Sequence, residues 1–551
     1  MNRPIPRTVL ISSALIVALL TTPILAQEES ATRRIPTTIE SWSAGDTPDV
    51  RGLADSLGLA GEEPLALSLD QTITLALQRN LTLVTQRYAR SRTLLAIEEA
   101  LGIYDINLSG TLSHSESTSP RTSSLEEGGT TLTSERQNWD FSANRQLSYG
   151  AGVQVDFNNT RTTNSNLTAS LSPQFIPTLR IAYQQSLLRN RGREVTERNI
   201  LVAKTNAAIS QEDFQTQVEV IVQQASDGYW NLVEALKQLE VAQESLAQAE
   251  ELHEMNRIQV EVGTKAPLEM VQSEATVASR REEIIQLRAN VDDEADGLRR
   301  LINLDRNLNW DRPIQPSTEP VVEFEAVDVN EAVEMALASR PDVRRQKLQN
   351  ENLELDARVA KNQAKPSLDF SASVSYSGIG GTLRGFDPST GEVFLIDETD
   401  YFDAVSVLSD RDFENIGMSV TFGYPIGNRA ARSRVAQAEL AVEQGDFELQ
   451  DLEMQVLSEV RRSVRALRTA AERIESAKVA SRLARENLDA EQKRYENGMS
   501  TSFQVTEIQE DLSQALSREV SAIINYRRAE TNYYRTIGKL LDEYDVELAT
   551  E

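Results

Sequence analysis

The feature that most constrains this chain of 551 residues is an internal duplication. The stretch Leu69–Leu77 resembles Val329–Leu337 at an offset of 260 residues, and Pro267–Met270 aligns with Ser502–Val505 at an offset of 235. In the second of these matches, each segment begins four residues after a glycine, Gly263 or Gly498. A repeat of this size predicts two structural units that share one plan.

Each repeat is predicted to contain a helix, a β segment, a very long helix and a last helix. Repeat 1 covers 65–303, with helices at 71–102, 194–259 and 268–303 and a β segment at 103–188. Repeat 2 covers 330–538, with helices at 330–363, 430–496 and 502–538 and a β segment at 366–426. In each repeat the two shorter helices together match the long helix, which spans about 100 Å at roughly 1.5 Å per residue. Two short helices stacked end to end therefore form a rod as long as the long helix.

The long helices carry a seven-residue pattern of apolar positions. Leu232, Leu239 and Leu246 recur at this spacing, with Ala235, Ala242 and Ala249 three places after each. Repeat 2 has the same pattern in Leu467, Ile474, Leu488, Ala470, Ala477 and Ala484, with Ser481 as its polar break. This pattern predicts a coiled-coil seam. Helices alone do not distinguish an ordinary coiled coil from a conduit.

The β segments alternate strictly between apolar and small polar residues. One face is predicted to contact lipid through Tyr104, Ile106, Leu108, Leu368, Phe370, Val374, Met418, Val420 and Phe422. The other face, with Ser371 and Ser373, is predicted to contact water. A half-buried sheet in water shows the same alternation. Small uncharged polar residues, aromatic enrichment and the long polar loops 115–137 and 378–412 favour an outer-membrane barrel. Because open strand edges are not tolerated in lipid, several chains are expected to share it.

The N-terminus has the pattern of a secretory signal peptide, predicted at 1–26 with cleavage near Ala26. The remaining segments are predicted to be an N-terminal linker at 27–64, an equatorial linker at 304–329 and a C-terminal tail at 539–551. Within the equatorial linker, 321–324 is predicted to be a short strand.

Composition excludes several functions. The chain has no Cys, only His114 and His253, and a formal charge of −28. Thiol chemistry, Cys-ligated metals and nucleic-acid binding are therefore not expected. No phosphate-binding loop or zinc-protease motif is present, so we expect no enzyme, no cofactor and no metal. The acidic loop at 387–412 is interpreted as a solvated loop rather than an ion site.

The duplicated order resembles the TolC-like outer-membrane efflux protein family over about residues 65–540. Arg494–Gly498 resembles the family's turn before its last helix, and Tyr424–Gly427 its strand exit. Gln185–Arg189 resembles the same exit in repeat 1, with Ser186 where Pro is usual. An additional alternating hairpin near 138–158 departs from the family's usual two strands per half.

The resemblance implies a mainly α-helical protein with membrane β-structure. It implies a homotrimer with one shared outer-membrane β-barrel on a long periplasmic α-helical barrel. It also implies three partners, namely a periplasmic adaptor, an inner-membrane pump of unassigned class, and outer-membrane lipid. The implied function is passive conduction of pumped substrates. The alternative is a non-conducting spacer or adhesin on a coiled-coil stalk.

The family constricts its tunnel at the periplasmic tip through a Tyr, an Arg and acidic residues. By position, Tyr495 keeps the Tyr, Ser500 replaces the Arg, Gln504 replaces one Asp and Glu507 keeps an acid. In repeat 1, Glu269 falls on the acid position, and Lys265 supplies a cation. The predicted gate, beside the turns at Gly263 and Gly498, consists of Lys265, Glu269, Tyr495, Gln504 and Glu507. The alternative is that they only cap helices, as a Thr501–Gln504 capping box would.

Overall fold

The computed structural model describes residues 64–120, 131–166, 169–304, 310, 312–322, 324, 327–387, 390 and 392–546. The predicted signal peptide and nearly all of the N-terminal linker lie outside these residues. The chain divides into two compact units, which are described separately. The strand unit contains Ile97–Ala203 and Glu354–Leu440. The helix unit contains the described residues of Thr47–Ala96, Lys204–Leu353 and Ala441–Glu551.

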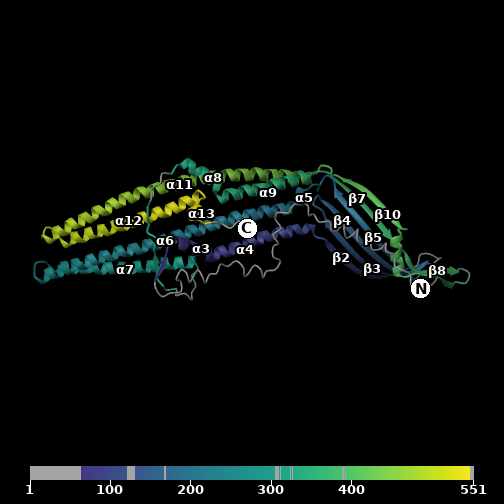
Figure 1. Ribbon diagram of the computed structural model, residues 1–551, viewed down its shortest axis with the longest axis horizontal. Coiled ribbons are helices and arrows are strands. Elements are labelled where there is room, and N and C mark those ends of the chain that lie inside the picture. The colour runs from purple at the N-terminus through teal and green to yellow at the C-terminus, as the bar shows by residue number, and fades with distance from the viewer. Residues whose placement is uncertain are drawn as a thin grey trace. The chain divides into compact units, whose positions relative to one another are not determined.

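The strand unit is built on one antiparallel sheet (Figure 1). Six strands follow each other in the order β10–β7–β5–β4–β3–β2, and a short hairpin of β8 and β9 branches from β5. The strands are β2 (Asn107–Pro120), β3 (Thr131–Gln146), β4 (Ala151–Asn164), β5 (Leu171–Ser186), β7 (Ser367–Ser377), β8 (Gly380–Asp387), β9 (Glu392–Glu398) and β10 (Glu414–Gly423). The hairpin of β3 and β4 contains the additional alternating segment at 138–158.

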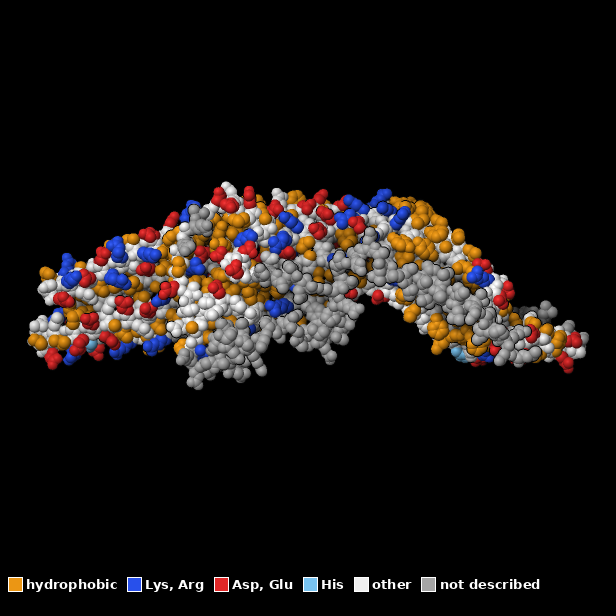
Figure 2. All heavy atoms as spheres, viewed as in Figure 1, with side chains coloured by type: hydrophobic (Ala, Val, Ile, Leu, Met, Phe, Trp, Pro, Cys, Tyr) orange, Lys and Arg blue, Asp and Glu red, His pale blue; other side chains and the backbone are white. Residues whose placement is uncertain are grey.

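The strand register gathers the apolar positions on one face. Val420 pairs with Phe370 and Phe422 with Leu368 across β10 and β7, and Phe370 pairs with Gln185 of β5. Through β5, β4 and β3, the same face reaches Leu108 of β2. Ser371 and Ser419 lie on the opposite face, where their hydroxyls are 2.7 Å apart. Figure 2 shows hydrophobic side chains gathered over the strands, with few charged groups among them.

The start of the first strand differs from the prediction. β2 begins at Asn107, so Tyr104 and Ile106 precede it, and Tyr104 lies in a 3₁₀ turn (Gly102–Tyr104). The Tyr104 hydroxyl donates a hydrogen bond of 2.8 Å to the Glu197 carboxylate. The prediction that Tyr104 belongs to the strand's apolar file is therefore wrong, because this side chain is held by a charged partner.

The segment predicted as a polar loop at 378–412 contains β8, β9 and helix α10 (Tyr401–Asp410). Asp400 caps this helix and forms a capping box with Asp403. A Cβ atom at Gly378 would come within 1.9 Å of the Ala404 carbonyl oxygen, so glycine is what lets α10 lie against the sheet. None of the described residues forms a cluster of acids and histidines that could hold a metal ion.

The helix unit contains most of the long helices. They are α3 (Leu69–Arg79), α4 (Leu81–Leu101), α6 (Arg198–Glu261), α7 (Pro267–Leu301), α8 (Val329–Ser339), α9 (Pro341–Gln363), α11 (Arg429–Glu496), α12 (Ser502–Thr536) and α13 (Leu540–Glu543). Of these, α4, α6, α9 and α11 continue into the strand unit, where a short α5 (Arg193–Thr196) precedes α6. None of the helices in the described part of the chain is apolar over enough residues to cross a bilayer.

The predicted single helices at 71–102 and 330–363 are each broken in two. The first break is at Asn80, whose side-chain oxygen accepts a hydrogen bond of 2.9 Å from the Thr82 amide. The second is at Arg340, before Pro341. Proline has no amide hydrogen and is tolerated only at the start of a helix, so α9 begins there.

The predicted seam is buried in part, and Leu239, Leu246, Ala477 and Ala484 are half-buried. In α6, Leu232, Ala235, Ala242 and Ala249 are at most 4% exposed, and in α11 Ile474 and Leu488 are at most 5% exposed. The strand predicted at 321–324 is wrong for its described residues. The linker's strand is β6 (Ile314–Pro316), which pairs in parallel with β1 (Leu65–Leu67), while Phe324 packs edge-on against Tyr526.

Candidate functional site at the tips of the helical hairpins

Two helical hairpins of the helix unit end in matching turns. Hairpin 1 is α6 and α7, and hairpin 2 is α11 and α12 (Figure 1). Gly263 and Gly498 adopt left-handed backbone conformations, with φ of 80° and 73°. In hairpin 1 the Thr264 amide donates to the Gln259 carbonyl at 2.8 Å, and in hairpin 2 the Met499 amide donates to the Arg494 carbonyl at 2.8 Å. Both turns therefore end their long helix with a Schellman motif, which requires the positive φ that glycine adopts readily.

The hairpins are joined at their tips by Lys265, Tyr495 and Glu269. The Lys265 ammonium donates a hydrogen bond to the Tyr495 hydroxyl and lies 3.8 Å from the centre of its ring. The same ammonium is 3.1 Å from the Glu269 carboxylate. Three of the five predicted gate residues thus form one network, in which a cation of hairpin 1 binds an aromatic ring of hairpin 2.

Two residues that sequence reasoning missed complete this network. The Tyr495 hydroxyl donates to the side-chain oxygen of Asn256, which is fully buried in α6. The Ser502 hydroxyl of α12 donates to Glu269 at 3.1 Å. Asn256 had a signal in the sequence, because it follows Ala235, Ala242 and Ala249 at the same spacing and is the first polar residue in that file.

The other two predicted gate residues, Gln504 and Glu507, lie outside the network, as does Ser500. Gln504 forms the predicted capping box with Thr501, so it holds the start of α12. Glu507 is exposed and makes no ion pair with any residue that the structure describes. Ser500, in place of the family's Arg, donates to the buried carboxylate of Glu491, within hairpin 2. The cation that links the two hairpins at the tip is therefore Lys265.

A second ion pair links the hairpins further from the turns. The Arg280 guanidinium of α7 binds the Glu510 carboxylate of α12 and also contacts Glu283 at 3.1 Å. Burial lowers the pKa of Arg280, but hydrogen bonds with Glu510 and Glu283 outweigh this effect and raise it. Hydrogen bonds from Gln514 and Arg280 hold the pKa of Glu510 below its usual value. Both groups stay charged near neutral pH, so the pair persists there.

The tips also expose apolar side chains to solvent. Val262 and Leu268 of hairpin 1 are 73% and 64% exposed, and Met499 and Phe503 of hairpin 2 are 72% and 68% exposed. A shared apolar cluster of Leu252, Leu488, Tyr495, Val505 and Leu512 lies beneath them. Exposed apolar residues grouped at one end of a molecule are typical of a binding surface.

Comparison with known proteins identifies the family. The model of the outer membrane efflux protein family matches residues 188–304 and 332–539, which is more than half of the chain and includes both hairpins. The chain belongs to the outer membrane efflux protein family. The resemblance stated from the duplicated order is therefore confirmed.

Solved structures share the fold of this efflux protein. The outer-membrane channel OprN has a TM-score of 0.62 and 14% identity, over 86% of this chain and 90% of that one. The Campylobacter jejuni CmeC outer-membrane channel has a TM-score of 0.60 and 14% identity, over 88% and 90%. VceC from Vibrio cholerae has a TM-score of 0.59 and 16% identity, over 85% and 96%. The search of curated proteins found no match. These likenesses confirm the predicted TolC-like fold class, and the family is one of outer-membrane channels rather than of enzymes.

Proposed function

We propose that this efflux protein is the outer-membrane exit channel of a tripartite efflux or type I secretion system. In this proposal three copies share one barrel through their strands and one periplasmic tunnel through their helices. Substrates handed over by an inner-membrane pump and a periplasmic adaptor pass through passively. The observation that carries the proposal is the Lys265–Tyr495–Glu269 network, which links two hairpins at a tip and resembles a latch more than a cap.

The latch is weak enough to open. An exposed ion pair contributes about 0–1 kcal/mol, and a buried polar group that loses its partner costs about 1–3 kcal/mol. Lys265 and Glu269 have side chains 19% and 30% exposed, so salt reaches their ion pair in part. That pair lies within hairpin 1, whereas Arg280–Glu510 joins the two hairpins and its Glu510 side chain is 41% exposed, so high salt is expected to weaken the closed state there. Parting of the hairpins would break the contacts of Tyr495 with Lys265 and Asn256 and that of Ser502 with Glu269, whereas the Lys265–Glu269 ion pair lies within hairpin 1 and would stay.

The exposed apolar tips support a role for the adaptor. Val262, Leu268, Met499 and Phe503 lie at the turns themselves, where a partner docking end-on would cover them. We propose that this contact stabilises the parted hairpins and so couples docking to opening. Three copies of Glu269 and Glu507 around a three-fold axis would favour cations over anions.

The proposal is tested by single-channel conductance in planar bilayers. A Lys265→Ala/Tyr495→Phe double variant is expected to conduct several-fold more than the parent, because it removes the link between the hairpins. Lys493→Ala is the matched control, since among the described residues Lys493 pairs with Asp489 of its own helix. Glu269→Gln is expected to lower cation selectivity.

Two results would contradict the proposal. If the double variant conducts no better than Lys493→Ala, and Glu269→Gln keeps full selectivity, these residues only hold the helix ends. If the parent carries no current under any condition, the protein is the non-conducting spacer or adhesin, for which the strand unit would serve as an anchor.

A further inference from the structure

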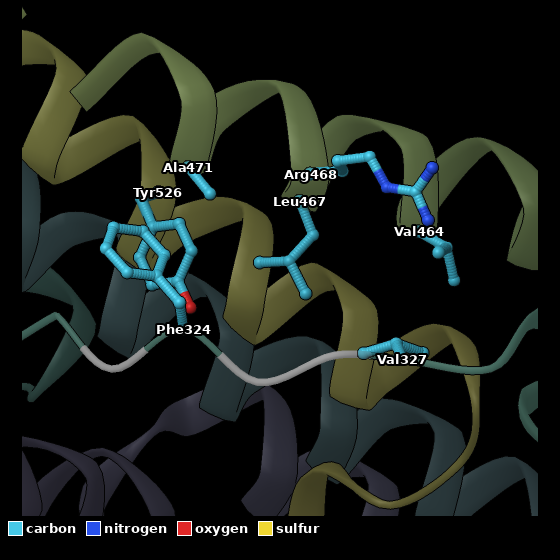
Figure 3. Close-up of a pocket in the computed structure, with 7 residues that line it drawn as sticks. All are labelled: Phe324, Val327, Val464, Leu467, Arg468, Ala471 and Tyr526. Carbon is cyan, nitrogen blue, oxygen red and sulfur yellow. The ribbon is translucent and has the colours of Figure 1, made fainter. Parts of the chain in front are cut away.

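The apolar surfaces of the two units are of different kinds. In the helix unit, Phe324, Leu467 and Tyr526 line a cavity of about 290 Å³ (Figure 3). In the strand unit the apolar side chains form an open face instead, on which Met418 and Phe422 of β10 are 74% and 67% exposed. Helix α10 packs on one end of this face, and its position there indicates what the helix contacts.

α10 is fixed to the apolar face of the sheet by Tyr401. The Tyr401 ring packs edge-on against Trp139 of β3 and Phe175 of β5, with ring centres 5.3 and 6.1 Å apart. The Tyr401 hydroxyl donates a hydrogen bond of 2.7 Å to the side-chain oxygen of Asn159 in β4, which is fully buried. Trp139 and Phe141 are two positions apart in β3 and therefore share a face. The helix thus covers the apolar face rather than the polar one.

The apolar part of this face has the height of a membrane. In β10 it extends from Ile416 to Phe422, between Glu414 at one end and Tyr424, which directly follows the strand, at the other. The ten residue steps from Glu414 to Tyr424, at roughly 3.3 Å each in strands tilted by about 40°, correspond to a height of about 25 Å. The apolar band of outer-membrane barrels has this height. The hydrocarbon layer is therefore spanned between these two residues.

The strand register places α10 just outside this band. Glu414 pairs with Tyr376 of β7. The helix approaches the sheet at Gly378, where an added Cβ atom would meet the Ala404 carbonyl oxygen. Gly378 is two positions beyond Tyr376, on the side away from Tyr424. The helix therefore begins to cover the face where the apolar band ends.

Beyond α10 the same face carries ionisable groups. Arg161 is two positions beyond Asn159 in β4, and its guanidinium is 4.0 Å from the carboxylate of Glu135 in β3. The same carboxylate is 3.7 Å from a ring nitrogen of His114 in β2. Such groups belong in water rather than in hydrocarbon. α10 thus lies between an apolar band and a charged region.

The exposed surface of α10 is itself divided into two sides. Phe402 and Ser409 are seven residues apart and share one side, and Phe402 is 76% exposed. Asp403 and Asp410 are also seven residues apart and share the other side, about 100° around the helix. A helix with one aromatic and one acidic side suits the boundary between lipid and water.

We propose that α10 is an interfacial helix that lies in the headgroup layer of the outer leaflet. The Phe402 side faces the hydrocarbon, and the Asp403 side faces water. The partner is the lipid surface itself, and the contact is apolar, because the acidic side chains do not favour an anionic surface. The inference rests on the proposed placement of the sheet in the outer membrane, and it does not depend on conduction or on partner proteins.

The test measures the depth of single nitroxide labels in the intact protein, reconstituted in vesicles of palmitoyl-oleoyl phosphatidylcholine. The chain has no cysteine, so Phe402→Cys, Asp410→Cys and Val420→Cys each carry one thiol for labelling. Depth is read from the ratio of collision rates with oxygen, which concentrates in hydrocarbon, and with a water-soluble nickel chelate. The ratio is expected to be highest at Val420, several-fold lower at Asp410 and intermediate at Phe402. Ser409→Cys is a second variant on the Phe402 side and should give a ratio close to that of Phe402→Cys.

Several outcomes would overturn the proposal. A ratio at Phe402 equal to that at Asp410 would show that α10 lies in water, and one equal to that at Val420 would place it within the hydrocarbon. A Phe402 label that neither collision partner reaches would show that another segment of the chain, or a second copy, covers the helix. A Val420 label in water would overturn the membrane placement of the sheet, and with it both this inference and the proposed function. If the Val420 label is deep and only the α10 labels deviate, the proposed function stands and this inference fails.

Discussion

The two repeats share a backbone plan, yet their interiors differ most at the same level of the helix unit. In repeat 1, Tyr229 and Trp230 are fully buried in a cluster that also gathers residues from β1, β6 and α13. In repeat 2, the same positions hold Val464 and Arg465, and Arg465 is exposed. The apolar cluster of repeat 2 consists mainly of residues from α8, α11 and α12. The comparison teaches that repeat 1 carries the sealed core, while repeat 2 keeps a surface open beside a similar set of helices.

The largest expected effect is loss of the buried tryptophan. Trp230→Ala should lower the free energy of unfolding by about 3–5 kcal/mol, because it leaves a large cavity. Arg465→Ala at the matching position should change it by no more than about 0.5 kcal/mol. Denaturant unfolding of the detergent-solubilised protein, followed by circular dichroism, measures both. Equal effects would show that the two clusters contribute alike.

A pH dependence is expected from a buried carboxyl of repeat 1, Glu219. Burial raises the pKa of Glu219 to about 7, against the hydrogen bond from Gln215 and the charge of Arg535. The folded state therefore holds a proton that the unfolded state has released above its ordinary pKa near 4.5. The contribution of this bound proton to the free energy of unfolding is fully present below about pH 4.5 and is lost as pH rises through about 7. The loss amounts to up to about 3 kcal/mol.

Glu219→Gln should remove this dependence and leave the variant more stable than the parent at pH 8. The counterpart position in repeat 2 is Met454, which does not titrate. Glu244→Gln, at an exposed position of the same helix, is the control. Unfolding measured at pH 5 and pH 8 checks the prediction, and an unchanged pH profile in Glu219→Gln would contradict it.

A close helix contact distinguishes repeat 2. A Cβ atom at Gly445 of α11 would lie 2.7 Å from the Asn350 side-chain oxygen and 2.8 Å from Leu353 of α9. Gly445→Ala should therefore lower the unfolding free energy by about 1–3 kcal/mol, despite the better helix propensity of Ala. Ser210, its counterpart in α6, tolerates a side chain already, so Ser210→Ala should cost nothing measurable. Thermal melts of both variants decide whether the approach of α9 is particular to repeat 2.

The smallest expected difference concerns the helix caps. The Ser68 side chain caps α3, and the Ser68 amide donates a hydrogen bond to the Gln71 side-chain oxygen in a capping box. Asp328 caps α8 with a single hydrogen bond of 2.7 Å, which it accepts from the Asn330 amide. Ser68→Ala and Asp328→Ala should each cost about 1 kcal/mol. Gln71→Ala in repeat 1 should lower the free energy of unfolding by a few tenths of a kcal/mol, whereas Glu331→Ala in repeat 2 should leave it unchanged. Chemical denaturation midpoints measure these shifts.

Periodicity made the long helices and the strands predictable from the sequence. The seven-residue seam lies where Leu232 and Ala235 placed it, because one buried stripe repeats over many turns. The breaks were missed, although Pro341 was a visible signal, because the apolar pattern continues across them. The pairing of β1 with β6 left no local signal, since its partners are far apart in the chain and three-residue strands have no period.

At the tip, the sequence identified the partners but not their geometry. Position relative to the glycine turns singled out Lys265, Glu269 and Tyr495, and the structure brings all three together. Gln504 and Glu507 were assigned by the same rule and lie outside the network, because Gln504 forms the capping box at the start of α12 and the Glu507 side chain is exposed. Arg280 and Glu510 were missed because their contact joins two different helices.

The repeat 1 core has a consequence for the order of folding. Its cluster contains Leu540 and Leu541 of α13, with Tyr544 and Val546 packed against it, so residues near the end of the chain complete a core begun near residue 65. A chain that is made and exported from its N-terminus cannot close this core until nearly all of it has arrived. The entropic cost of closing so long a loop grows only slowly with its length. Closure of this core is therefore delayed by the order in which the segments arrive rather than by its free energy. Until then the first repeat exposes apolar surface, and it is the stage of biogenesis at which the chain most needs protection from aggregation.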